Sequence, residues 1–299
     1  MEITQSNISG LTTGYKVAFN KQLEDTKIVY EQFTTKIQSQ TKYEDYPFLG
    51  QMPGMKEWIG DREIQNFESN NYIVANKSYE DTIAINRDDI EDDQYGKYKP
   101  VIQGFADAAA RLPQELTVKA MIGGFANKCY DGKAFFATDH KMGKNVYSNR
   151  STEKLSRIAF RRGRTAMRSL VGDKGRALGI VPDLLVVSPT NEYVGREILE
   201  EDRLENGASN PDKGLARLLV LDELATDPDV WFLFCTGKFL KPMIYQERKK
   251  PTFTYLTGDK DLNVFMSNKY IYGADARGAA AYGFPQMAYG STGETNAQG

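Results

Sequence analysis

One short stretch of the chain brings together residue types that can do chemistry. The segment CYDGKAFFATDH, residues 129–140, contains Cys129, Asp131, Asp139 and His140, and His140 is the only histidine of the chain. A thiol near an imidazole and a carboxylate is the residue set of a cysteine nucleophile. The simpler interpretation is that Cys129 is a small buried residue and His140 a hydrogen-bonding loop residue. We favour the simpler one, because closeness in sequence rarely produces triad geometry.

An acidic cluster offers a second possible site. The stretch RDDIEDDQYG, residues 87–96, contains Asp88, Asp89, Glu91, Asp92 and Asp93. It lacks the glycine and the closing glutamate of a calcium loop, whereas carboxylates at a helix N-terminus are favoured by the helix dipole. We therefore favour the interpretation that these carboxylates stabilise a helix N-terminus and do not bind calcium. Since a single histidine also excludes a multi-histidine metal site, the sequence predicts no metal, no cofactor and no catalytic residue.

Basic residues concentrate on a helix predicted over 151–172. They are Arg157, Arg161, Arg162, Arg164 and Arg168. Long basic side chains on a polar helix face need no function beyond solvation. Contact with phosphates is the alternative, and we therefore carry all of them forward as candidate DNA-facing residues.

Composition limits the class of protein. The 299 residues include 38 Lys and Arg against 40 Asp and Glu, whereas a dedicated nucleic-acid binder normally has a basic excess. Cys129 and Cys235 fit no zinc or redox spacing, which favours a reduced, cytosolic setting. The polar start MEITQSNISG predicts no signal peptide, and nothing approaches the ~20 apolar residues of a membrane span.

The first 86 residues contain no strongly predicted core helix, and residues 1–40 show little regular periodicity. We expect an arm over 1–40 with one short helix near 10–24, a Pro- and Gly-rich loop over 41–60, and a long exposed hairpin over 62–86. A lone hairpin is marginal in water. The segment nevertheless contains many large apolar residues: Tyr43, Tyr46, Phe48, Leu49, Met52, Met55, Trp58 and Ile59. We expect part of this surface to pack on the chain's own core and the remainder on other copies.

Helices and strands follow in an α+β order. Apolar spacing predicts a helix that ends before Pro113, because proline disrupts a helix interior, and a second helix over 113–126. Ser151 is the expected N-cap of helix 151–172, and a further helix is predicted near 190–200. Strands are predicted over 183–188, 217–222, 230–235, 241–246 and 263–267, and the tail STGETNAQG is predicted to be disordered.

The segment YIYGADARGAAAYGFPQMAYG, residues 270–290, poses a separate question. Asp275 and Arg277 are its only charged residues. It is either a strand that passes through a core formed by earlier segments or an adhesive surface that awaits a partner. Its small residues permit close backbone packing, and Gly273, Gly278 and Gly283 would allow bends or bulges.

Six blocks of the sequence carry a resemblance to a known family. They are PFLGQMPGMKEWIGDREI (47–64), RDDIEDDQYGKY (87–98), CYDGKAFFATDH (129–140), PDLLVVSP (182–189), WFLFCTGKFLKPMIYQERKKP (231–251) and GADARGAAAYGFPQMAYG (273–290). In this order they resemble the major head subunit of Mu-like phages and prophages. The resemblance extends over nearly the whole chain, although no single block is decisive.

The resemblance implies the Hong Kong 97-like capsid fold. It implies an N-terminal arm over 1–40, an extended hairpin called the E-loop over 41–86, a peripheral domain over 87–150 and 251–282 with a spine helix within 94–126, and an axial domain over 151–250 and 283–299. Residues 270–282 would then be a strand paired with earlier peripheral strands, with PQMAYG crossing back to the axial domain.

The resemblance also implies a function and partners. The chain would be a virion capsid protein, assembled in the host cytoplasm as hexamers and pentamers of an icosahedral shell around double-stranded DNA. A separate scaffold protein, a portal and a decoration protein would be its partners. In such shells the arm and the E-loop lie across neighbouring subunits, so Trp58 and Arg62 are candidate intersubunit contacts, although Trp58 is equally suited to its own core. The alternatives are an encapsulin-like nanocompartment that encloses enzymes, an enzyme built around Cys129, and a nucleic-acid binder.

Overall fold

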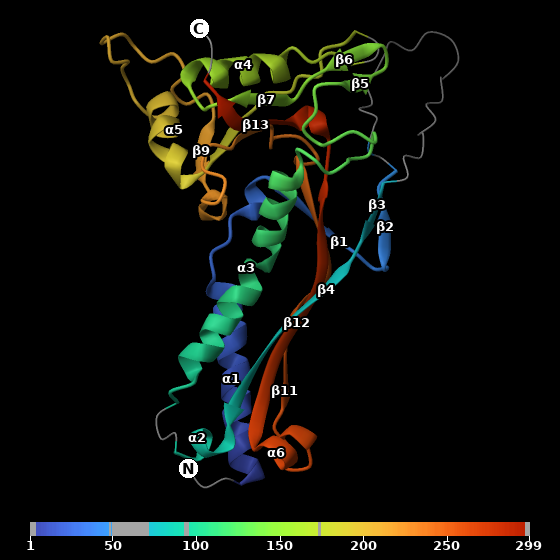
Figure 1. Ribbon diagram of the computed structural model, residues 1–299, viewed down its shortest axis with the longest axis vertical. Helices are drawn as coiled ribbons and strands as arrows, with labels where there is room; N and C mark the ends of the chain where they lie inside the picture. Colours follow the sequence, from blue (N-terminus) through green and yellow to red (C-terminus); the bar gives the residue numbers. More distant parts are fainter. Residues whose placement is uncertain (1–3, 48, 50–71, 93–95, 173–174, 297–299) are drawn as a thin grey trace.

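The computed structural model describes residues 4–47, 49, 72–92, 96–172 and 175–296. The chain forms an elongated lower body and a wider upper body (Figure 1). Helices and strands are mixed in both, which confirms the predicted α+β class. Within these residues no helix combines the length and the apolar character that a membrane crossing requires.

A four-stranded sheet runs along the lower body (Figure 1). Its strands, in spatial order, are β1 (Thr34–Gln38), β11 (Met243–Leu256), β12 (Lys269–Tyr282) and β4 (Lys77–Asn86). β12 is antiparallel to both of its neighbours, whereas β1 is parallel to β11. The C-terminal segment is therefore an internal strand, as predicted.

Two long helices cover one face of this sheet, α1 (Gln5–Asp25) and α3 (Lys99–Gly123). Side chains alternate along β12, and its buried set includes Tyr270 and Tyr272, which pack with apolar residues of both helices. Phe19 of α1 lies against Phe105 of α3, with ring centroids 5.7 Å apart.

A five-stranded sheet forms the upper body, with the order β7 (Arg150–Glu153), β13 (Ala288–Thr295), β10 (Trp231–Phe234), β8 (Leu184–Val187) and β9 (Arg217–Val220). Every residue of β8 and β10 is buried, as expected for fully covered apolar strands. Helices α4 (Arg157–Arg168) and α5 (Glu192–Leu199) belong to this body.

Short elements connect these parts. They are α2 (Arg87–Asp92), α6 (Leu262–Ser267), the paired strands β2 (Tyr43–Asp45) and β3 (Ile73–Ala75), the paired strands β5 (His140–Met142) and β6 (Asn145–Tyr147), and the 3-10 turns η1 (Tyr30–Gln32), η2 (Pro189–Asn191), η3 (Asp222–Leu224) and η4 (Pro285–Met287).

The leading segment folds back on its own chain further than we expected. Ile8, Tyr15 and Phe19 are buried against the lower sheet, and Tyr46 and Leu49 are buried in the upper core. Part of the leading surface was expected to pack on the chain's own core, and Tyr46 and Leu49 do so; α1 does so as well, because its apolar side chains find a matching face on α3 and β12. Tyr43 is exposed, and Phe48, Met52, Met55, Trp58 and Ile59 lie outside the described residues.

Several predicted boundaries are wrong for identifiable reasons. Pro113 is buried inside one continuous helix, α3, so tertiary packing outweighs the loss of one backbone hydrogen bond. Ser156, not Ser151, caps α4 by accepting a hydrogen bond from the Ala159 N–H at 3.2 Å. Ser151 instead lies in β7, where it pairs with Ser291 of β13.

Three further elements differ from expectation. Residues 263–267 lie in helix α6, since a short apolar run fits either conformation. The described part of 62–86 is no hairpin, because β3 pairs with β2 and β4 pairs with β12. Residues 291–295 of the predicted disordered tail continue β13, where Ser291 and Thr295 pair with β7.

Gly278 provides a test of how tightly β11 and β12 pack. A Cβ atom at this position would lie 2.7 Å from the Tyr245 hydroxyl and 2.8 Å from the Gln246 carbonyl oxygen. We expect G278A to lower the free energy of unfolding by about 1–3 kcal/mol, because the strands must separate. Chemical denaturation measures the change.

Gly104 is the matched control. It is exposed in α3, and a Cβ there would meet nothing within 4 Å. G104A should stabilise the protein by about 1 kcal/mol through helix propensity. Equal effects of the two substitutions would contradict the close approach at Gly278.

Candidate functional site

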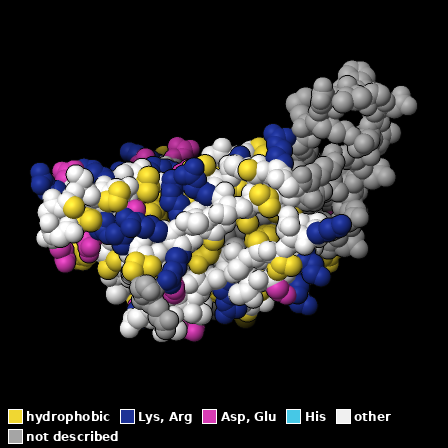
Figure 2. Space-filling model, turned by 90° about the horizontal axis from the view of Figure 1, so that it is seen from above, with side chains coloured by type: hydrophobic (Ala, Val, Ile, Leu, Met, Phe, Trp, Pro, Cys, Tyr) yellow, Lys and Arg dark blue, Asp and Glu magenta, His cyan; other side chains and the backbone are white. Residues whose placement is uncertain are grey.

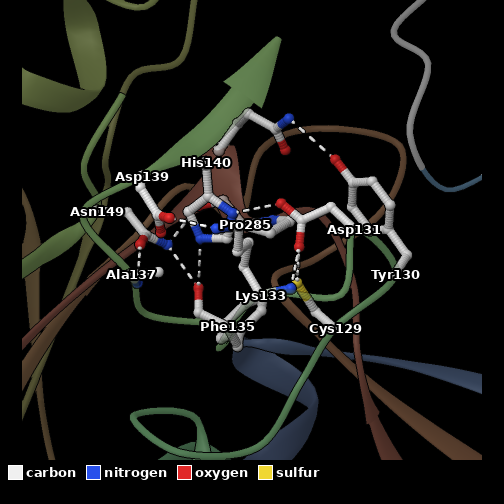
Figure 3. Close-up of polar contacts among 11 residues, drawn as sticks. Cys129, Tyr130, Asp131, Lys133, Phe135, Ala137, Asp139, His140, Asn149 and Pro285 are labelled. Atoms are coloured by element: carbon white, nitrogen blue, oxygen red, sulfur yellow. Dashed lines mark hydrogen bonds and ion pairs between the residues drawn. The ribbon is translucent and has the colours of Figure 1, made fainter. Parts of the chain in front are cut away.

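The loop that carries Cys129 and His140 is held in a fixed shape by Asn149 (Figure 3). The Asn149 side chain is buried, accepts a hydrogen bond from the Ala137 N–H at 2.8 Å, and donates to the carbonyl oxygens of Phe135 at 2.8 Å and Pro285 at 3.1 Å. Sequence reasoning did not single out this residue. An asparagine whose amide satisfies three backbone groups fixes a loop without regular secondary structure.

Asp131 lies at the centre of the candidate chemical group (Figure 3). Its Oδ1 accepts from the Cys129 thiol at 3.1 Å and from the Lys133 N–H at 3.0 Å. Its Oδ2 lies 2.6 Å from Nδ1 of His140, a side chain that is fully buried. The structure therefore brings Cys129, Asp131 and His140 together, while Asp139 is exposed and forms an ion pair with Lys133.

The charges of this group follow from burial and hydrogen bonding. Burial alone would raise the pKa of Asp131, but the hydrogen bonds from His140 and from the Lys133 N–H outweigh it and lower the pKa. Burial raises the pKa of the Cys129 thiol, and the negative charge of Asp131 adds to the rise. Asp131 is thus the anion and Cys129 remains a neutral thiol at pH 7.

This arrangement does not suit nucleophilic catalysis. A cysteine nucleophile needs a base in contact with its sulfur and a lowered thiol pKa. Here the sulfur contacts Asp131, while the two ring nitrogens of His140 face Asp131 and, at 3.2 Å, the carbonyl oxygen of Phe135. The contacts are those of a buried polar cluster that stabilises a loop.

The same distances decide against a metal site. Within the described ranges these three side chains form the one group whose possible ligand atoms converge, all within 4.8 Å of one another. Bonds of about 2.0–2.1 Å at tetrahedral angles would separate nitrogen and oxygen ligands by about 3.3 Å. The Nδ1–Oδ2 distance of 2.6 Å is that of a hydrogen bond. The spacing of His140 and Asp131 therefore suits a hydrogen bond between the two side chains and is too short for two ligands of one metal ion.

The arginines of α4 mainly bind other parts of the same chain. Arg161 forms a bidentate pair with Asp212, with Nε–Oδ1 2.9 Å and Nη2–Oδ2 2.8 Å, and this hydrogen bonding raises the pKa of Arg161. Arg157 donates to Asn210 at 2.7 Å and lies 3.4 Å from Asp212. These contacts attach α4 to the loop before β9, a role that sequence reasoning missed because Asp212 is remote in sequence.

The other three arginines differ in exposure. Arg162 pairs with Glu153 and is half exposed. Arg164 donates to the carbonyl oxygens of Pro182 at 2.8 Å and Leu215 at 3.1 Å, and its partial burial lowers its pKa. Arg168 is exposed at the end of α4. Seen from above, basic side chains on this end of the molecule are interspersed with acidic and apolar ones (Figure 2).

Two other predicted groups can be placed only in part. Asp88 and Asp89 lie in the first turn of the short helix α2, where Asp88 accepts a hydrogen bond from Asn268 at 2.9 Å. Asp93 lies outside the described residues, and so do the candidate intersubunit contacts Trp58 and Arg62. The assignment of Trp58 and Arg62 to contacts between subunits therefore stays a prediction.

Comparison with known proteins gives one consistent result. The chain matches the family model of the Mu-like prophage major head subunit gpT over residues 8–152, 146–224 and 222–299. It is 31% identical over 296 residues to the Mu-like prophage FluMu major head subunit of Haemophilus influenzae, covering 99% of this chain and 76% of that protein. It is 31% identical over 294 residues to the major capsid protein of Escherichia phage Mu, covering 98% and 76%.

The solved structures agree with the sequence relatives. A chain in the procapsid of bacteriophage JBD30 is similar to this one with a TM-score of 0.63 and 33% identity, over 98% of this chain and 77% of that one. The resemblance that the six sequence blocks carry is confirmed.

The protonation of Asp131 has a measurable consequence for stability. Its folded pKa is lowered, so its contribution is present at pH 7 and is lost as the pH falls from about 3.9 through the folded value. We expect D131N to lower the free energy of unfolding at pH 7 by about 1–3 kcal/mol, since His140 and the Cys129 thiol lose an anionic acceptor. Denaturation of both proteins from pH 7 to pH 2.5 tests the change.

The difference between the wild type and D131N should shrink at the acidic end of that range. The exposed neighbour Asp139 supplies the control, and D139N should have little effect at any pH because exposed ion pairs contribute little. A difference that stays constant down to pH 2.5 would contradict the assignment of the charge to Asp131.

Proposed function

This chain belongs to the family of the Mu-like prophage major head subunit, and we propose that it builds the capsid shell of a tailed phage or prophage. The observation that supports this most is the match to named head and capsid subunits along nearly the whole chain. A shell subunit must present surfaces to several neighbours. The elongated lower body and wider upper body provide such surfaces at both ends of the molecule (Figure 1).

The shell that we propose is icosahedral and is made of hexamers and pentamers around double-stranded DNA. Its further partners would be a separate scaffold protein, a portal and a decoration protein, and assembly would take place in the host cytoplasm. These finer statements follow from the resemblance to the family. The near balance of charge, 38 basic against 40 acidic residues, is that of a protein which contacts DNA at only part of its surface and is not a dedicated nucleic-acid binder.

The domain assignment is also a proposal. The lower sheet with α1 and α3 corresponds to the peripheral domain, 87–150 and 251–282, together with the arm, 1–40. The upper sheet corresponds to the axial domain, 151–250 and 283–299. The division is supported by the crossing of the chain at η4, after which β13 joins the upper sheet. The E-loop would be 41–86, although its last strand, β4, pairs with β12 in the lower sheet.

The proposed role is structural and not catalytic. The geometry around Cys129 supports this, because the sulfur and the imidazole are both engaged with Asp131. The encapsulin-like alternative is not favoured, since the relatives at 31% identity are phage head and capsid subunits. Trp58 and Arg62 remain our candidates for contacts between subunits.

Electron microscopy tests the proposed assembly. The full chain, expressed with its genomic neighbours, should form closed shells of uniform diameter, and particles from a phage lysate should contain the chain as their main protein. Size-exclusion chromatography should place most of the protein in the void volume. A protein that stays monomeric in both preparations would rule the proposal out.

Arg168 provides a test of contact with DNA. It is exposed on α4, and within the described residues it forms no ion pair. If α4 faces the packaged DNA, R168Q should weaken the salt dependence of binding. The negative slope of log affinity against log salt concentration should become less steep by about 0.9 for each phosphate contact that is lost. Filter binding of random duplex DNA at several salt concentrations measures the slope.

Arg203 is a suitable control, since it is exposed on the loop between α5 and β9 and is not part of α4. R203Q should leave the slope unchanged. If R168Q has the slope of the wild type, the assignment of this face to DNA fails.

A further inference from the structure

The paired strands β2 and β3 form a small ribbon that needs support from the body of the protein. Each strand has three residues, and only the central residues, Glu44 and Val74, are even half buried. Tyr43 and Ile73 are 53% and 59% exposed. An isolated two-stranded ribbon of this length is not stable in water. Its direction must therefore be set where it joins the rest of the chain.

A chain of side-chain hydrogen bonds makes that junction, and its central member is Gln246 of β11. The Tyr46 hydroxyl donates to Gln246 Oε1 at 2.8 Å, and Gln246 Nε2 donates to Asn76 Oδ1 at 2.7 Å. Asn76 Nδ2 donates to the Ser39 hydroxyl at 2.7 Å, which donates to Glu44 Oε1 at 2.7 Å. We call these five residues the relay.

The relay is buried and its members satisfy one another. Gln246 is 0% exposed, and Ser39, Tyr46 and Asn76 are also buried. Gln246 Nε2 also contacts the Val74 carbonyl oxygen at 3.2 Å, and Asn76 Nδ2 donates to the Thr41 carbonyl oxygen at 2.8 Å. The four hydrogen bonds that join one relay member to the next all run in the same direction, from the Tyr46 hydroxyl to the Glu44 carboxylate. Such buried chains strengthen one another and are costly to interrupt.

The protonation states of the two end residues, Glu44 and Tyr46, fix this direction. The hydrogen bond from Ser39 and those from the N–H groups of Gln40 and Thr41 lower the pKa of Glu44 to about 2, so it is an acceptor at neutral pH. Burial raises the pKa of Tyr46, and the charge of Glu44 adds to the rise, so the phenol stays a donor. The relay thus joins the segments before β2 and after β3 to one residue, Gln246, of the four-stranded sheet.

We propose that Gln246 is a positioning residue that fixes, through the relay, the direction in which the β2–β3 ribbon leaves the body. The consequence for assembly depends on the proposed function, in which residues 41–86 reach neighbouring subunits. A ribbon held at one angle gives each subunit the same reach. A ribbon free to swing would present its contacts at variable positions.

The first test measures the ribbon in the unassembled protein. Spin labels at I73C in β3 and T254C in β11, both exposed positions, report the distance between ribbon and sheet, while the native cysteines are buried. The Q246L variant removes the three side-chain hydrogen bonds of Gln246 with little change in volume. We expect its distance distribution to broaden and shift, whereas that of the otherwise wild-type chain should be narrow.

Q286L is the matched control. Gln286 is also buried, at 3% exposed, but its side chain donates one hydrogen bond, to the Tyr130 hydroxyl at 3.2 Å, and it lies outside the relay. Q286L should leave the distance distribution unchanged even where its thermal stability falls as far as that of Q246L. This comparison separates positioning from a general loss of stability. Identical narrow distributions in Q246L and the wild type would overturn the inference.

The second test uses electron microscopy of assembled material. Q246L should lose shells of uniform diameter and give irregular or open particles, while Q286L should retain them. If Q246L forms shells of normal diameter, the proposed function stands and the inference fails. If the wild type forms no shells, the proposed function fails, and the spin-label distances still decide whether Gln246 positions the ribbon.

Discussion

The antiparallel pairing of β11 with β12 is the interaction on which the rest of the structure depends. Both strands run from the upper body to the far end of the lower one (Figure 1). At one end Ile244 and Ala281 belong to the upper core, next to them Tyr245 and Tyr282 belong to a second core, and toward the other end a third core contains Phe253 with the partner strand. Since each core contains residues of the same two strands, a shift in their register would disturb all of them.

Small residues allow this pairing to remain close. Gly278 accommodates the Tyr245 side chain, and the register shifts between Glu247 and Thr252 follow directly after the point where Gly278 pairs. The glycine thus permits a close approach on one strand, while the bulges lie on the other. Tyr282 then ends β12, donates to the Ala120 carbonyl oxygen of α3 at 2.7 Å, and stacks on Phe135 with centroids 4.6 Å apart. The loop around His140 is positioned by the end of the same strand.

Much of the fold could be predicted from patterns that are local in sequence. The strands near 183–188, 217–222 and 230–235 are short runs with an apolar centre, and the structure has them within one or two residues. The charge pattern of residues 270–290 allowed either a strand or an adhesive surface, and the strand was predicted from the resemblance to the capsid family. The continuous α3 and the helix α6 were not predicted, because their conformations depend on packing partners far away in the sequence. A local rule, such as the exclusion of proline from a helix interior, fails where burial of the side chain offsets the lost backbone hydrogen bond.

The candidate site shows the same limit. The closeness of Cys129, Asp131 and His140 followed from their sequence spacing, but the decisive fact, that the carboxylate lies between thiol and imidazole, is a matter of orientation. Asp212 and Asn149 act on residues of distant segments and carry no local signal. Gln246 did carry one, since a glutamine at the end of an apolar strand has to find partners once it is buried.

The relay also explains why a polar group is retained at that point of the sheet. Apolar packing at the base of the ribbon would bury as much surface, but it is non-directional and would tolerate several angles between ribbon and sheet. Hydrogen bonds weaken steeply when their angles deviate, so a relay that ends on the charged Glu44 favours one orientation. The leading residues already find most of their apolar contacts within their own chain. Further buried area would therefore do less for the ribbon than a fixed direction. The hydrogen bonds of Gln246 to Tyr46 and Asn76 define that direction.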